Sequence, residues 1–278
     1  AYGIDSWGGV LRLGIPLTDK LSSTVFYTYV DQSTVITGSA GKPTIIRAES
    51  DGGVVIDAKG QNVPLTLDGA YVRVEGIKFL NGSSWVGQLN GNNLEVLRCA
   101  FGNGGSGMYD GILNASGNDI LIEDSWMWGR GKAGIEVNGG RTTLRRLVIR
   151  LDYYASTMGY MGVLLYGAYD TLVENVITLD FNTSSTTFDW KGGFRSRDMS
   201  DTRTQRYYGT IALNLPYDGY RMSDSHYENV IAWAVAGKGG MYEDSWKSGY
   251  SVKNATVGST STGGAGTMKV PVARPMFP

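Results

Sequence analysis

Short runs of alternating apolar and polar residues recur along this chain. The clearest runs are Val72-Arg73-Val74-Glu75, Leu94-Glu95-Val96-Leu97 and Ile120-Leu121-Ile122-Glu123. Alternation with a period of two is typical of a β-strand that buries one face. The pattern therefore predicts many short strands, and long helices are not expected.

The strand pattern repeats at a nearly constant spacing. Its central apolar positions lie 22 to 29 residues apart, except for one interval of 54 that we divide into two periods with a degenerate copy near Ile211. A glycine followed by an apolar residue repeats in phase with the strands, at steps of 21 to 31 residues. The central positions are Val74, Val96, Ile122, Leu144, Val173, Tyr227 and Val252, and the glycines are Gly111, Gly134, Gly162, Gly193, Gly219 and Gly240.

A repeat of this length with two or three short strands is typical of one coil of a parallel β-solenoid. The pattern predicts an all-β protein of about ten coils, in which the central residues point inward and stack at about 4.8 Å. Asn175, Asn229 and Asn254 are expected to form corners, because asparagine tolerates a left-handed backbone. We divide the chain into an N-terminal segment with the first coil (1–40), the solenoid (41–258) and an extended C-terminal tail (259–278).

Composition and charge exclude several classes of partner. The 40 glycines and 18% charged residues are typical of a turn-rich β protein. The net charge of −1 leaves no positive electrostatic field that would attract the phosphates of a nucleic acid. No apolar run is long enough to span a membrane. Cys99, the single cysteine, is expected to be a small buried residue. A start without Met and four glycosylation sequons, at Asn81, Asn114, Asn182 and Asn254, lead us to expect a secreted or surface-exposed protein.

Three stretches resemble the opening coils of the right-handed β-helix polysaccharide lyases, which include pectate lyases and the alginate lyase and chondroitinase B group. They are Gly41–Glu49, Gly53–Gly60 and Val74–Phe79. Asn214–Tyr220 resembles the Asp-Asp-Gly-Phe-Asp turn of the pectate lyase 9 group. The resemblance covers about residues 40 to 258 and implies a right-handed parallel β-helix.

The resemblance also implies a chemistry. Such lyases hold a calcium ion against the uronate of an acidic polysaccharide, and a nearby Lys or Arg removes the C5 proton in a β-elimination. Asp218 and Glu243 are the candidate calcium ligands. The turn departs from the family pattern, since one aspartate replaces the pair and Arg221 stands where a calcium ligand would be needed.

Charged and aromatic residues fall at fixed offsets from the repeated glycines and form a predicted stripe. The residues two places after each glycine are Leu113, Glu136, Leu164, Arg195, Arg221 and Tyr242. Lys191, Arg195, Arg221 and Lys238 are the candidate catalytic residues, because cations on one face suit a polyanion. The candidate substrate-binding residues are Glu136, Trp190, Arg197, Tyr217 and Tyr242, since aromatic rings stack on the apolar faces of sugars.

Two classes of function remain open. The first is an enzyme that binds and cleaves acidic polysaccharide, and the second is a structural or adhesive module, such as a viral fibre or spike or a cell-surface component. No capping helix is visible at the start of the sequence, so self-association or a partner subunit is expected to cover the solenoid ends. No carboxylate pair is marked out for hydrolysis, and the single histidine, His226, is expected to be structural.

Overall fold

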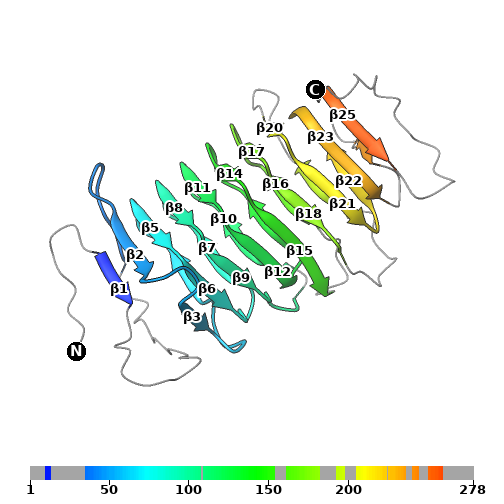
Figure 1. Ribbon diagram of the computed structural model, residues 1–278. Coiled ribbons are helices and arrows are strands. Elements are labelled where there is room, and N and C mark those ends of the chain that lie inside the picture. The colour runs from blue at the N-terminus through cyan, green and yellow to red at the C-terminus, as the bar shows by residue number, and fades with distance from the viewer. Residues whose placement is uncertain are drawn as a thin grey trace.

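The computed structural model describes residues 35–107, 109–153, 161–181, 192–197, 205–223, 225–235, 240–243 and 250–258, together with the backbone of 10–13. These residues form strands and no helix, so no helix among them could cross a membrane. The paired strands are all parallel, and they stack along one axis (Figure 1). The fold is a parallel β-helix.

Each complete turn contributes one strand to each of three faces. Face 1 contains β2 (Thr44–Ala48), β5 (Val72–Glu75), β8 (Leu94–Leu97), β11 (Ile120–Glu123), β14 (Thr143–Arg145), β17 (Leu172–Glu174) and β20 (Gln205–Tyr208), with β1 (Val10–Leu13) paired to β2. Face 2 contains β3 (Val54–Asp57), β6 (Ile77–Leu80), β9 (Ala100–Gly102), β12 (Trp126–Arg130), β15 (Val148–Tyr153), β18 (Ile177–Leu179) and β21 (Ile211–Leu215). Face 3 contains β4 (Leu65–Leu67), β7 (Gly87–Leu89), β10 (Leu113–Ala115), β13 (Ala133–Val137), β16 (Met161–Tyr166), β19 (Gly192–Arg197), β22 (Asp218–Met222) and β24 (Met241–Glu243).

Two long strands join faces 1 and 2 at the C-terminal end. The first part of β23 (Ser225–Val235) pairs with β20 and its second part with β21, and β25 (Ser251–Gly258) follows β23 along both parts. Face 3 forms a separate sheet of eight strands, so the chain makes seven turns between the first and the last of them. The described residues thus form about seven turns, and our expectation of ten coils was too high.

The central inward row lies on face 1 and confirms most of the predicted register. Val74, Val96, Ile122, Leu144 and Val173 occupy successive turns, and each is fully buried. The next position is Tyr207, which pairs with Val173 on one side and Tyr227 on the other. The degenerate copy that we expected near Ile211 is therefore Tyr207. Ile211 lies on face 2, because the corner at Gly209 separates it from Tyr207.

The core changes character toward the C-terminal end. Aliphatic residues and the stacked pair Phe79 and Phe101, with ring centres 5.3 Å apart, fill the earlier turns. The later turns instead stack rings that include buried tyrosines, Tyr207 on Tyr227 at 4.7 Å and Phe194 on Tyr220 at 4.9 Å. The buried hydroxyl of Tyr207 lies 2.8 Å from that of Ser196. Burial raises the pKa of both Tyr207 and Tyr220, so each phenol stays neutral and able to donate a hydrogen bond.

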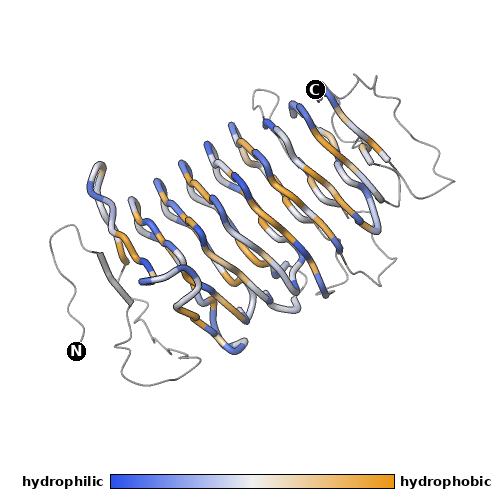
Figure 2. The backbone as a smooth tube through the Cα atoms, in the orientation of Figure 1, coloured by the Kyte–Doolittle hydropathy of each residue, from blue (hydrophilic) through white to orange (hydrophobic). Residues whose placement is uncertain are grey.

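The corner between faces 1 and 2 is a single residue in the left-handed region. Asn175, Asn229 and Asn254 have φ values of 53°, 54° and 54° there, which confirms their corner role. The Asn254 amide donates to the Asn229 side chain at 3.0 Å, so the corners also bond to one another. In Figure 2 hydrophobic residues follow the strands, while many corners are hydrophilic.

Cys99 follows the same corner and is buried, as expected. Removal from water raises the pKa of its thiol to about 11, so the thiol is protonated at neutral pH.

Candidate functional site

The outer surface of face 3 carries one continuous row of side chains, with one residue from each turn. Backbone register places Thr66, Gln88, Asn114, Glu136, Leu164, Arg195 and Arg221 in that order, and we call these seven residues the face 3 row. The backbone of Tyr242 is next in register after Arg221. The predicted stripe agrees with this row at every position except the first. Leu113 points into the core and is fully buried, and Asn114 takes the outer position.

The cationic part of the face 3 row consists of Arg195 on β19 and Arg221 on β22. The two residues are direct register partners, so their backbones are separated by one inter-strand step of about 4.8 Å. Both side chains are buried, with exposed fractions of 1% and 3%. Two buried guanidinium groups so close together require nearby anions, because like charges repel strongly away from water.

One such anion is Asp218 at the start of β22. Its Oδ2 lies 3.0 Å from Nε of Arg221, and the carboxylate is buried as well. A charge-assisted bond of this kind fixes the direction of the guanidinium group. Asp218 therefore positions Arg221, and the pair is a structural unit of the site.

Asp218 fits a calcium site poorly in this arrangement. A guanidinium group 3.0 Å away occupies one carboxylate oxygen and repels a second cation. Within the described part of the chain, no group of three His, Cys, Asp or Glu residues lies close enough to hold a metal ion. The backbone of Glu243, the second candidate ligand, pairs with Met222. The structure does not describe the side chain of Glu243.

Two other predicted binding residues lie on the same turns as the arginine pair. The Arg197 guanidinium lies over the exposed Tyr166 ring, 5.5 Å from its centre. Tyr217 immediately precedes Asp218 and is half-buried. Arg197 therefore ends the strand that carries Arg195, and Tyr217 directly precedes the strand that carries Arg221.

Glu136 lies two turns before Arg195 and makes an ion pair with Lys132, whose Nζ is 2.9 Å from Oε2. Lys132 also lies over the ring of Tyr109, 5.7 Å from its centre. Leu164 separates Glu136 from Arg195 and forms a small apolar cluster with Ala133 and Met161. The repeat places Lys132 two residues before Gly134, the offset that Lys191 and Lys238 share, but sequence reasoning did not make it a site candidate and did not find this cluster.

Several predicted site residues lie outside the described residues. These are Lys191, Trp190 and Lys238. For Tyr242 the structure describes only the backbone, which pairs with Arg221. Their roles stay predictions.

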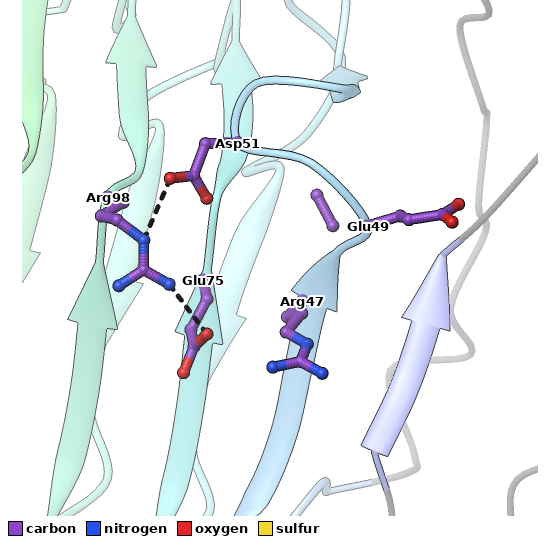
Figure 3. A pocket seen from close by; sticks show the side chains of 6 residues that line it. Arg47, Glu49, Asp51, Glu75 and Arg98 are labelled. Atoms are coloured by element: carbon purple, nitrogen blue, oxygen red, sulfur yellow. Dashed lines mark hydrogen bonds and ion pairs between the residues drawn. The ribbon is translucent and has the colours of Figure 1, made fainter.

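A pocket of about 230 Å³ opens at the other end of the helix, lined by Arg47, Ala48, Glu49, Asp51, Glu75 and Arg98. Figure 3 shows Arg98 between two carboxylates, with Nη2 3.0 Å from Glu75 and Nε 3.0 Å from Asp51. Asp51, Glu75 and Arg98 are therefore bonded to one another inside the pocket. Because their bonding groups are already engaged, this pocket is the weaker candidate for binding a ligand.

Comparisons with known proteins support the fold. No protein-family model and no curated protein matches the sequence. The structure is similar to a crystal structure of alginate lyase from Paenibacillus sp. str. FPU-7, with a TM-score of 0.57, 13% identity, and coverage of 82% of this chain and 86% of that chain. It is also similar to a crystal structure of pectate lyase Pel9A, with a TM-score of 0.51, 13% identity, and coverage of 96% and 71%. At this level of identity the likeness shows that the chain has the β-helix fold of these polysaccharide lyases.

Proposed function

We propose that this protein binds a uronate-containing polysaccharide along face 3 and cleaves it by β-elimination. The observation that supports the proposal is the stacking of Arg195 on Arg221 in adjacent turns. Guanidinium groups bind carboxylates with two parallel hydrogen bonds, and a uronate polymer presents carboxylates in series. The fold shared with alginate and pectate lyases is consistent with such a substrate. Work on such a polymer also accords with our expectation of a secreted or surface location.

The proposed roles follow from the chemistry of each side chain. Arginine stays protonated in proteins, so Arg195 and Arg221 suit substrate binding and stabilisation of the enolate charge better than proton removal. The base that removes the C5 proton is then one of the predicted lysines, Lys191 or Lys238. A lysine becomes a base when neighbouring cations lower its pKa, and the two arginines would supply that effect to a lysine placed beside them as the repeat predicts.

The remaining predicted residues would extend the site along the chain of sugars. Arg197 adds a third cation, and Glu136 offers a hydrogen-bond acceptor near the middle of the face 3 row, two turns from Arg195. Trp190, Tyr217 and Tyr242 would supply aromatic surfaces. Because Asp218 fits calcium poorly, no step of the proposal passes through a metal ion.

The test measures binding and product formation with oligomers of pectate, alginate and glycosaminoglycans. Elimination creates an unsaturated uronide that absorbs ultraviolet light. Arg221→Gln alone would leave Asp218 buried without Arg221, so the informative variant is Asp218→Asn with Arg221→Gln, which removes both charges. We expect this double variant to fold and to lose at least tenfold in affinity. Arg145→Gln, on face 1, is the matched control and should bind as the native protein does.

A second candidate is a non-enzymatic module that binds a glycan through the more exposed polar residues of the face 3 row, Thr66, Gln88 and Asn114. A catalytic site has to admit the substrate carbon, and side chains that are 1% and 3% exposed offer little access. Binding of acidic oligomers without unsaturated products would support the module and contradict the lyase. Absence of any binding would contradict both.

A further inference from the structure

The outer surface of face 2 is apolar over five successive turns, a feature with no role in the proposed function. Trp126, Val148, Ile231 and Trp233 have exposed fractions of 49%, 38%, 37% and 54%. They are four of the seven large hydrophobic side chains that are exposed in the described part of the chain. Most of the exposed apolar side chains are therefore gathered on one of the three faces.

Backbone register shows that these side chains form a continuous surface. One outer row runs Trp126, Val148, Ile177, Ile211 and Ile231, and the parallel row runs Trp128, Arg150, Leu179, Leu213 and Trp233. Nine of these ten residues are apolar. We call the ten residues the apolar face; it lies over β12, β15, β18, β21 and the second part of β23 (Figure 1).

At each end of the apolar face an indole packs over a glycine. A Cβ atom on Gly102 would lie 2.7 Å from the Trp128 ring, and one on Gly258 would lie 2.4 Å from the Trp233 ring. Trp126 packs edge-on against Trp128, with ring centres 5.6 Å apart. The indoles are thus held by their own neighbours while still exposing apolar surface.

Charge on the apolar face is minimal. Arg150 is its one charged residue, and its Nε lies 2.6 Å from Oδ1 of Asp152 on the same strand. Two copies of the apolar face could therefore meet without repulsion between unpaired charges. An acidic polysaccharide, in contrast, would find few cations there.

The size of the apolar face also indicates its partner. Four exposed and several half-buried large side chains present on the order of 500 Å² of apolar surface, which is near the upper limit for a monomeric protein. A stable interface buries roughly 800 Å² on each partner, with an apolar core and a polar rim. The apolar face has the right size for such a core, and the charged rows of face 1 at its border can supply the rim.

We propose that the apolar face is an interface between two copies of this chain, packed side by side. Both partners are straight stacks with the same spacing of about 4.8 Å between strands, so the side-chain rows of one copy can fit between those of the other. This lateral association differs from the capping of the solenoid ends expected from sequence. It is independent of the proposed activity on face 3.

The experiment measures the mass of the native protein in solution by sedimentation or light scattering across a concentration series. We expect a species of two chains, and the double variant Val148→Lys with Ile231→Lys should sediment as one chain. Both side chains point outward, so the variant should keep its circular dichroism. Leu172→Lys, an aliphatic residue on the outside of face 1, is the matched control and should remain a dimer.

Two results would overturn the proposal. One is a native protein that stays a single chain at every concentration. If the tryptophan fluorescence of that single chain responds to a neutral glycan, the apolar face binds the glycan and not a second copy. The other is a Val148→Lys and Ile231→Lys variant that remains a dimer. If the double variant fails to fold, the native concentration series decides the matter, because dissociation on dilution should move the tryptophan emission to longer wavelength.

Discussion

Faces 1 and 2 are built from the same turns and meet at the same single-residue corner, yet their outer surfaces differ in charge. Face 1 carries ion pairs between neighbouring turns beside a few outward leucines, with Arg73 bonded to Glu95 at 2.6 Å and Arg145 bonded to Glu174 at 2.7 Å. Face 2 presents tryptophan and aliphatic side chains over five turns. The inner rows of both faces are alike, since each stacks buried residues.

The difference separates two demands on the sequence. Inward positions must be apolar or fully hydrogen-bonded, because they lose contact with water on either face. Outward positions stay in contact with water, so the residue types found there reflect solubility or binding. Charge rows on face 1 suit exposure to water, whereas an exposed apolar surface of comparable length calls for a partner.

The largest expected effect comes from placing a charge in an inner row. Ile122→Asp on face 1 and Ile149→Asp on face 2 should each cost more than about 4 kcal/mol of unfolding free energy, because both side chains are fully buried. The outward neighbours Leu121→Lys and Val148→Lys should cost about 1 kcal/mol or less. Chemical denaturation followed by circular dichroism measures all four. A folded, cooperatively melting Ile122→Asp protein would refute the inner register.

A smaller effect is expected at the corner that separates the two faces. Asn175→Val should destabilise the protein by about 1–2 kcal/mol, because a β-branched residue resists the left-handed backbone at φ 53°. Asn175→Gly is the control and should change the unfolding free energy by less than about 1 kcal/mol. Equal losses in the two variants would mean that the Asn175 side chain, and not its backbone angle, stabilises the corner.

The smallest effect concerns the charged corners, and it should depend on pH. Hydrogen bonds from Arg146 and Arg141 lower the pKa values of Asp124 and Asp119 below their ordinary value of 3.8. A carboxyl with a lowered pKa in the folded state stabilises the protein above its unfolded pKa, and this contribution is lost as the pH falls below about 4. The melting temperature should therefore drop modestly in acid. Asp119→Asn should reduce that drop, and an unchanged acid profile would show that the exposed pair contributes nothing.

Much of the fold could be predicted because its signal is local and repeated. The spacing of Val74, Val96 and Ile122 fixes the inner row, since each turn buries equivalent residues. The prediction failed between Val173 and Tyr227, because the turn from Val173 to Tyr207 is longer than the other turns and Tyr207 was not recognised as the equivalent position. A constant period cannot locate a residue when the chain between two strands lengthens.

The site was predictable in part. The repeat of glycines placed Arg195 and Arg221 in neighbouring turns, which the structure also shows. Sequence spacing could not show that both side chains are buried or that Asp218 bonds to Arg221, because burial and bond direction depend on residues from other turns. The charged pocket around Arg98 was missed for the same reason, since Asp51 and Arg98 are 47 residues apart.

By itself the sequence determined the solenoid, the inner row on face 1 and the asparagine corners, because all three depend on short-range alternation and backbone preference. Only the tertiary structure decided which outward residues share a surface. Trp126 and Trp233 are far apart in sequence but lie four turns apart on face 2, and no local pattern joins them. The register between strands brings residues that are distant in sequence side by side on one surface. That register depends on all the stacked turns together.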